Sequence, residues 1–218
     1  MKPLPVDVLA TAMNASVNAA LEVTGIQATG FAIDSRHITP GDVFCALEGE
    51  RVDGHDFAAE AIAAGAVAII TNRDIADVPC LVTDNSLEAL GRLAHWYRTH
   101  ELSATVIAVT GSSGKTTTKD LIADVLPGAV VAARSSFNTE VGVPLTILEA
   151  DPSTDYLVLE MGMRGIGHIA YLAEMAEPDI GVVLNVGLAH VGMMKGPEEI
   201  ARAKSELVRA LSAKNVAV

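Results

Sequence analysis

The chain has 218 residues, half of them hydrophobic, and a formal net charge of -12 from 27 acidic and 15 basic side chains. This length fits one large domain or two ordinary ones, and the composition is that of a globular chain with a substantial core. The acidic balance disfavours non-specific binding to nucleic acid or to an anionic membrane, so an anionic ligand needs a local site. We therefore expect no nucleic-acid partner.

The N-terminal residues, the apolar runs and the cysteines indicate the cellular compartment. Asp7 comes early and no sustained apolar stretch follows it, so we expect no signal peptide, and no apolar run approaches the length of a membrane span. The sequence thus predicts a cytoplasmic protein with no membrane partner. Cys45 and Cys80 lie within apolar, strand-like runs, which predicts buried, inert thiols rather than a disulfide or a nucleophile.

The first hundred residues predict a compact α/β unit. In chain order, the patterns predict a helix over 5–18, an extended stretch over 25–32, a strand over 43–47, a polar loop over 49–55, a helix over 57–64, a strand over 66–70 and a helix over 87–101. Residues 102–104 are the expected boundary. This places an N-terminal domain at 1–103 and a second domain at 104–218.

A hydroxyl and a guanidinium stand together in Asp34-Ser35-Arg36, just after an extended stretch. Ser35 and Arg36 form a suitable pair for gripping a diphosphate. The alternative is a capped turn with a solvated arginine, and these three residues alone favour that alternative.

A nucleotide-binding loop is predicted where a β-branched run over 106–109 meets a Gly-rich turn and a helical pattern over 119–126. Gly111 and Gly114 permit a tight backbone path, which points successive N–H groups at phosphate oxygens from a helix N-terminus. The predicted phosphate-binding residues are Thr110, Gly111, Ser112, Ser113, Gly114, Lys115, Thr116 and Thr117.

Two side chains of this loop have predicted roles. Lys115 would reach the β- and γ-phosphates, and the Thr116 hydroxyl would ligate Mg²⁺. The match to G-x-x-x-x-G-K-[ST] is incomplete, because Val109 stands where the first glycine is usual. An ordinary Gly/Ser turn is the alternative, but a Gly-Lys-Thr triplet that enters a helix directly after a buried strand favours nucleotide binding.

Strands and helices continue to alternate after the loop. The patterns predict a strand over 130–133, a polar loop over 135–144, a strand over 156–160, a helix over 165–176, a strand over 180–185, a helix from 197 and a strand over 215–218. This alternation predicts a mostly parallel, doubly wound sheet with helices on both faces. Ligands of such a sheet bind at the carboxyl ends of its strands.

Several polar residues fall at those ends. Asn138 and Thr139 would contact a ligand, or else cap the following helix. Glu160 ends a strand and is a predicted Mg²⁺ ligand, with a solvated strand-end acid as the alternative. His190 follows the next strand, where either a metal or phosphate ligand or a structural histidine fits.

Lys204 stands on the inward face of the last helix, four residues after Ile200 and three before Leu207. A lysine in this position usually extends its ammonium to solvent or pairs with a carboxylate. A functional role is the alternative.

Together, these segments resemble the Mur ligase family of peptidoglycan synthesis. The segments that carry the resemblance are Asp34-Ser-Arg, Pro40-Gly-Asp-Val-Phe, Asp53-Gly-His, Thr110-Gly-Ser-Ser-Gly-Lys-Thr, Phe137-Asn-Thr-Glu-Val-Gly-Val-Pro, Glu160-Met-Gly, Asn185-Val-Gly-Leu-Ala-His and Ala203-Lys-Ser-Glu-Leu. The segments that begin at Phe137 and Glu160 point to the branch of the family that adds D-Ala-D-Ala to UDP-MurNAc-tripeptide.

The resemblance implies a three-domain enzyme: a UDP-substrate-binding domain, a central ATP-binding domain and a C-terminal domain. By this resemblance the chain is a fragment that holds the first domain and a truncated second, and we expect it to be monomeric and inactive by itself. The implied reaction is ATP-dependent amide formation. The γ-phosphoryl group activates the terminal carboxylate as an acyl phosphate, which the amine of D-Ala-D-Ala attacks.

The resemblance also assigns residues. It implies Thr116 and Glu160 as ligands of the Mg²⁺ on ATP, with Lys115 neutralising the transferred group. It implies His190 and a carbamylated Lys204 at a second Mg²⁺. The implied UDP-substrate contacts are Ser35, Arg36, Asn138 and Thr139.

Three other functions remain open. One is a Mur ligase that adds diaminopimelate or lysine, and another is a folylpolyglutamate synthase, against which the segment 34–55 argues. The third is a nucleotide-binding module without catalysis.

Overall fold

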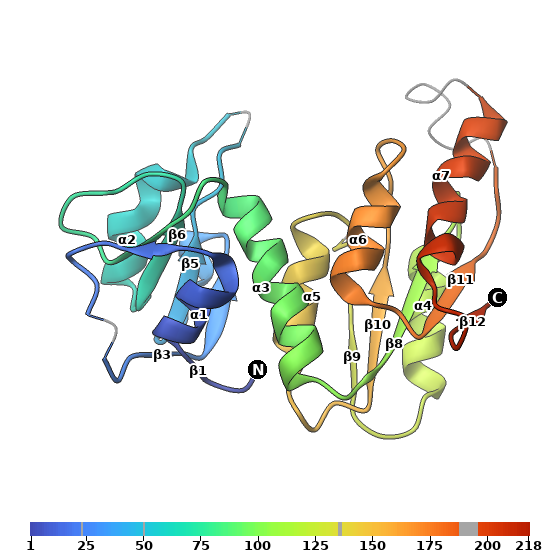
Figure 1. Cartoon of the computed structure of the whole chain (residues 1–218), viewed down its shortest axis with the longest axis horizontal. Coiled ribbons are helices and arrows are strands. Elements are labelled where there is room, and N and C mark those ends of the chain that lie inside the picture. The colour runs from blue at the N-terminus through green and yellow to red at the C-terminus, as the bar shows by residue number, and fades with distance from the viewer. Residues whose placement is uncertain (23, 50, 135–136, 188–195) are drawn as a thin grey trace. The chain divides into compact units, whose positions relative to one another are not determined.

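The structure is a computed structural model of the chain and describes residues 1–22, 24–49, 51–134, 137–187 and 196–218. The chain forms two compact units, Met1–Trp96 and Tyr97–Val218. The division falls within α3, which spans Ser86–Glu101 (Figure 1).

The first unit is built on a five-stranded sheet of order β2-β7-β6-β5-β4. Neighbours from β4 to β7 run parallel, and β2 pairs antiparallel at one edge. Its elements are β1 (Leu4–Pro5), α1 (Val6–Met13), β2 (Ser16–Val17), β3 (Gln27–Ala28), β4 (Gly30–Ala32), β5 (Asp42–Cys45), α2 (Ala58–Ala63), β6 (Ala68–Thr71) and β7 (Cys80–Val82). Single 3₁₀ turns cover Ser35–His37 and Gly54–Phe57.

The N-terminal helix is shorter than the predicted span of 5–18. It ends at Met13, because Asn14 takes a left-handed conformation with φ of 55° and closes the helix. Cys45 and Cys80 are buried and free, as predicted. Burial raises the pKa of the Cys45 thiol to about 12, so it stays neutral.

The second unit contains a five-stranded parallel sheet of order β12-β11-β8-β10-β9. The prediction of a mostly parallel sheet after the loop is therefore confirmed. Its elements are β8 (Thr105–Thr110), α4 (Lys115–Val125), β9 (Val130–Ala132), α5 (Gly142–Glu149), β10 (Tyr156–Glu160), α6 (His168–Ala176), β11 (Ile180–Val183), α7 (Pro197–Ala210) and β12 (Val216–Ala217).

One face of this sheet packs against α4. Ile107, Val109 and Val158 form a buried cluster, against which Ile122 of α4 and Leu126, just after the helix, pack. Burial of these strand side chains is the main local stabilisation, at about 25 cal/mol for each Å² of apolar surface removed from water.

The other face packs against α7. Ala108 points away from its neighbour Ile107, and it lies in register with Gly181 of β11. A Cβ atom on Gly181 would come within 3.0 Å of the Leu211 Cδ1 atom and 3.2 Å of the Leu207 Cγ atom. Helices therefore cover both faces, as predicted, and a glycine in β11 lets the last helix approach closely.

Figure 1 shows α6 and α7 side by side in the second unit. They are joined by Glu206, whose carboxylate accepts hydrogen bonds from the Gly167 N–H at 2.7 Å and the Ala170 N–H at 3.1 Å. A carboxylate at a helix N-terminus satisfies donors that lack partners within the helix, and its charge complements the dipole. The contact holds α7 against the start of α6.

Two helices of the second unit differ from their predicted limits. The helix predicted from 119 begins at Lys115, because Gly114 takes a left-handed φ of 81° and turns the chain directly into the helix. The helix predicted from 165 begins at His168, so Ile166 precedes it and is exposed rather than inward-facing. On α7, Ile200 and Leu207 are buried as predicted, and Lys204 lies beside them in the core.

Among the described residues, no helix combines the length and the apolar character that crossing a bilayer requires.

Candidate functional site

The predicted phosphate-binding loop joins β8 to α4 as expected. Gly114 supplies the left-handed turn, and α4 starts at the following residue. The Lys115 ammonium folds back to donate a hydrogen bond to the Gly111 carbonyl at 3.1 Å. Strand, turn and helix thus bring a cation and a helix N-terminus to the same place.

Three successive backbone donors at this helix start have no acceptor among the described residues. They are the N–H groups of Lys115, Thr116 and Thr117, and no side chain caps the helix. Residues 112–118 are exposed or half-buried. Open amides at a helix N-terminus, with the positive end of the dipole behind them, suit phosphate oxygens.

Glu160 connects two of the predicted site residues. Its carboxylate accepts a hydrogen bond from the Thr116 hydroxyl at 2.7 Å through Oε2, and one from the Asn138 side-chain amide at 2.8 Å through Oε1. The main-chain carbonyl of Asn138 accepts a hydrogen bond from the Gly162 N–H at 2.7 Å. Thr116 and Asn138, from separate segments, therefore meet at one carboxylate.

The charge of Glu160 is buried, with only 2% of the residue exposed, yet both of its partners are neutral. No ion pair to it is found within the described part of the chain. A buried carboxylate beside a hydroxyl, with no cation of its own, is a donor set that suits Mg²⁺. Among the described residues no three His, Cys, Asp or Glu side chains gather, so further ligands would come from other groups.

Lys204 of α7 is 1% exposed. Burial, and secondarily the nearby charge of Lys115, lower the pKa of its ammonium from 10.5 to about 8. None of the described residues forms a hydrogen bond or ion pair with it. The inward position predicted from helical spacing is confirmed, whereas extension to solvent and pairing with a described carboxylate are not seen.

The other predicted site residues of the second unit are placed differently. Thr139 lies three residues before α5, and its carbonyl accepts a hydrogen bond from the Val143 N–H at 2.9 Å. Its hydroxyl accepts one from the Val141 N–H at 3.5 Å, in the turn before the helix, and no side chain caps α5 itself. His190 lies outside the described residues, so its predicted metal role stays a prediction.

In the first unit, Arg36 is held by its neighbour. Its guanidinium donates to both carboxylate oxygens of Asp34, at 2.8 Å and 2.6 Å, and holds the pKa of Asp34 well below the usual range. The Ser35 hydroxyl points inward and donates to Glu60 at 3.2 Å. A capped turn is thus present, and contact with a diphosphate stays a prediction for both residues.

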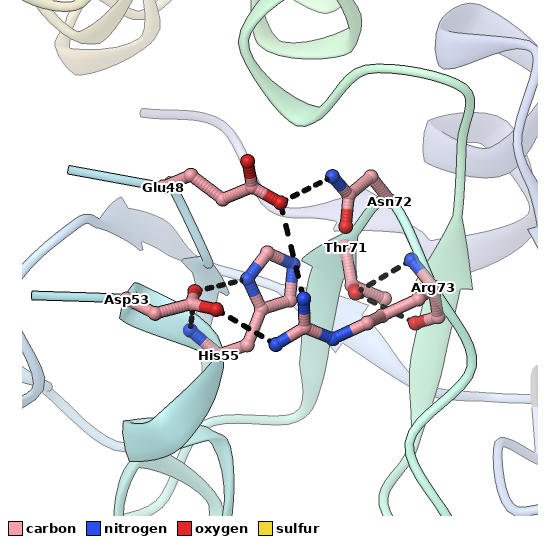
Figure 2. Close-up of polar contacts among 6 residues, drawn as sticks. All are labelled: Glu48, Asp53, His55, Thr71, Asn72 and Arg73. Carbon is pink, nitrogen blue, oxygen red and sulfur yellow. Dashed lines mark hydrogen bonds and ion pairs between the residues drawn. The ribbon is translucent and has the colours of Figure 1, made fainter. Parts of the chain in front are cut away.

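A polar network that the sequence did not predict lies in the same unit (Figure 2). Arg73 donates to Asp53 at 2.8 Å and forms a longer ion pair with Glu48 at 3.8 Å, while Asn72 donates to Glu48 at 2.9 Å. Glu48 and Asp53 face each other across the loop between them. Arg73 therefore clamps both ends of that loop.

His55 lies beneath this network and bonds to Asp53 through Nδ1 at 2.5 Å. Backbone and side-chain hydrogen bonds from His55 and Arg73 hold the pKa of the Asp53 carboxyl well below its usual range. The buried Nε2 atom of His55 has no hydrogen-bond partner among the residues that the structure describes. The Asp-Gly-His segment thus acts here as the anchor of a loop.

Sequence reasoning assigned no role to two further residues around the nucleotide loop. Lys119 is buried on α4 and donates to the Ala133 carbonyl at 2.5 Å. Asn185 follows β11 and bonds to the loop backbone. For Lys119, the four-residue spacing from Lys115 on a helix was an available signal. Asn185 was named only as the first residue of a segment that carries the family resemblance.

Comparison with known proteins now identifies the family. The pattern of the Mur ligase middle domain matches residues 109–218, and that described as the Mur ligase family catalytic domain matches residues 27–98. The chain belongs to the Mur ligase family. Curated relatives named UDP-N-acetylmuramoyl-tripeptide--D-alanyl-D-alanine ligase include one from Mycobacterium leprae, 47% identical over 85% of this chain and 41% of its own length.

The relative of the same name from Escherichia coli is 36% identical over 93% of this chain and 45% of its own length. A crystal structure of MurF from Acinetobacter baumannii matches with a TM-score of 0.93 at 35% identity, covering 100% of this chain and 48% of that one. A MurF structure from Thermotoga maritima in complex with ADP has a TM-score of 0.79 at 39% identity, covering 86% and 44%. The chain thus spans less than half the length of these relatives.

The lowered pKa of Lys204 predicts a specific pH dependence of stability. Between about pH 8 and 10.5 the folded state has lost this proton and the unfolded state still holds it, so stability rises with pH across that window. Urea unfolding in CO₂-free buffer measures this effect. The free energy of unfolding should rise with pH in the wild type, by at most roughly 3 kcal/mol, and should not show this rise in Lys204→Met. Lys214→Met, at an exposed position, is the control, and equal slopes in all three proteins would contradict the burial effect.

Proposed function

We propose that this chain carries the substrate-binding and ATP-binding parts of a ligase that joins D-Ala-D-Ala to UDP-MurNAc-tripeptide, in the cytoplasm and as a monomer. The observation that carries the proposal is the meeting of Thr116, Asn138 and Glu160 beside the open amides of the phosphate loop. The names of the similar proteins supply the substrates, and family membership supplies the reaction class.

The chain's own residues support phosphoryl transfer from ATP. The amides of 115–117 would bind phosphate oxygens, and Lys115 would leave the Gly111 carbonyl to reach the γ-phosphate. Thr116 and Glu160 would hold Mg²⁺, which neutralises charge on the triphosphate. A likeness to a protein solved with ADP agrees with a nucleotide here.

Ligation would then follow from activation of a carboxylate. The substrate's terminal carboxylate takes the γ-phosphoryl group, because a free carboxylate is a poor electrophile, and the amine of D-Ala-D-Ala displaces phosphate. In this chain Lys115 would balance negative charge that develops on the transferred group. The relatives extend well beyond the matched length, so we expect the 218-residue chain by itself to bind nucleotide without turnover.

Lys204 is proposed to carry a carbamate. Its neutral amine would attack CO₂ and release a proton, which exchanges a buried cation for an anionic oxygen ligand. Burial and the lowered pKa support this step, because only the neutral amine reacts. With His190, the carbamate would hold a second Mg²⁺.

The N-terminal domain predicted at 1–103 is proposed to bind the UDP-substrate. Ser35 and Arg36 are its proposed contacts. Asn138 and Thr139 are also proposed as substrate contacts, on the family resemblance alone. The half of the Arg36 guanidinium not bonded to Asp34 remains exposed, and it can still donate to an anionic group.

Removing the charge of Glu160 should weaken metal-dependent nucleotide binding. Glu160→Gln keeps the size and one acceptor oxygen, and we expect its Kd for Mg²⁺-bound AMP-PNP to rise about tenfold or more, a change of 1.4 kcal/mol or above. Binding without Mg²⁺ should change little. Isothermal titration calorimetry measures both, with Glu174→Gln on the exposed side of α6 as control, and an unchanged Mg²⁺ dependence would count against the metal role.

The acceptor can be tested with the complete gene product. Phosphate release from ATP in the presence of UDP-MurNAc-tripeptide should depend on D-Ala-D-Ala, and should not respond to free lysine or diaminopimelate. Stimulation by the free amino acid alone would overturn the proposed substrate.

The carbamate has a direct spectroscopic test. In [¹³C]bicarbonate, the wild type should show a carbamate carbon signal that Lys204→Met lacks and Lys214→Met retains. If the wild type and Lys204→Met give identical spectra, Lys204 is not carbamylated.

A further inference from the structure

Asn185 connects the end of β11 to the phosphate loop. Its Oδ1 atom accepts hydrogen bonds from the Ser112 N–H at 3.0 Å and the Ser113 N–H at 3.1 Å. Its Nδ2 atom donates to the Ser113 carbonyl at 3.1 Å. A single carboxamide thus makes three hydrogen bonds to two successive residues of the loop.

Backbone contacts bring the two segments together. The Leu184 N–H donates to the Thr110 carbonyl at 3.0 Å, and a Cβ atom on Gly111 would come within 3.0 Å of the Leu184 Cβ atom. The Ser112 hydroxyl accepts from the Gly187 N–H at 2.8 Å and donates to the Gly187 carbonyl at 3.2 Å. The chain that leaves β11 therefore lies along the first half of the loop, where glycine at 111 permits the approach.

These bonds divide the loop's donors into two groups. The amides of Ser112 and Ser113 are satisfied by Asn185, whereas those of Lys115, Thr116 and Thr117 have no acceptor among the described residues. The first group is therefore used within the protein, and the second is open to a ligand. The predicted cradle of eight residues acts in two parts.

We propose that Asn185 is a positioning residue for the nucleotide loop. It fixes Ser112 and Ser113 in the conformation from which the amides of 115–117 meet the phosphates of a nucleoside triphosphate, and it does not itself contact them. This rests on the proposed nucleotide binding and adds to it the residue that prearranges the loop.

The physical reason is the cost of ordering. The loop contains Gly111 and Gly114, which have more backbone freedom than other residues, so an unrestrained loop would lose that freedom when the nucleotide binds. A loop that is already held binds more tightly, because less ordering remains to be done. One net hydrogen bond corresponds to roughly a fivefold change in affinity, so loss of the carboxamide should weaken binding about tenfold or more.

The experiment compares Asn185→Ala and Asn185→Asp with the wild type and with Asn215→Ala. Asn215 is a matched control, because it also donates through Nδ2 to a backbone carbonyl, that of Pro178, but lies in the turn before β12. Two quantities are measured: the Kd for Mg²⁺-bound AMP-PNP, and the hydrogen exchange of the Ser112 and Ser113 amides without nucleotide. Thermal unfolding checks that each variant folds.

For Asn185→Ala we expect faster exchange at the Ser113 amide, which loses its acceptor, and a smaller change at the Ser112 amide, which also donates to the main-chain carbonyl of Asn185 at 3.2 Å. The Kd should rise about tenfold, with the melting temperature close to that of Asn215→Ala. Asn185→Asp keeps the Oδ1 acceptor but adds a negative charge beside the site. This variant should retain slow amide exchange and yet bind nucleotide more weakly. A purely structural role would change the exchange rate and the affinity together.

Tighter binding in Asn185→Ala would show that the carboxamide competes with phosphate, and would overturn the proposal. If Asn185→Ala changed neither the Kd nor the exchange rates, the proposal would be overturned as well. The proposed function would still stand in that case, because the wild type would bind nucleotide. No nucleotide binding by the wild type would instead contradict the proposed function, and the positioning role with it.

Discussion

The site depends on the parallel pairing of β8 with β10. Their register sets Glu160 opposite Val109, and the Met161 N–H donates to the Val109 carbonyl at 2.9 Å. Both strands end at the same edge of the sheet, where α4 begins within five residues of β8. A slip of one residue would turn the Glu160 side chain to the other face, away from Thr116.

Three of the buried ionisable side chains in this unit differ in the partners that they have. Lys119 is compensated by the Ala133 carbonyl and by Asp120. Glu160 is hydrogen-bonded by neutral groups, and Lys204 has no partner among the described residues. Burying an ion without a partner costs several kcal/mol. Because the charge of Lys119 is compensated within the fold, we assign it a structural role. The other two are those expected to change state or partner when ligands bind.

The first unit uses its charges for a different purpose. Arg73 pairs with Glu48 and Asp53, which lie at the two ends of one loop (Figure 2). Asp53 also accepts a hydrogen bond from the His55 backbone N–H and is hydrogen-bonded to the Nδ1 atom of the His55 ring. These ion pairs are partly exposed, so each contributes modestly to stability, and their value lies in the shape of the loop. The sequence showed Asp53 and His55 only as parts of a motif.

The sequence by itself determined those features that arise within a few residues. Strand, glycine turn and helix follow one another around residues 106–126, and helical spacing placed Lys204 inward, because burial period and backbone freedom are local properties. Only the tertiary structure brought Thr116 to Glu160 across 44 residues, Asn138 to Glu160 across 22, and Ser112 to Asn185 across 73. Such contacts follow from strand order and register, which the pattern of apolar and polar residues along one segment does not contain.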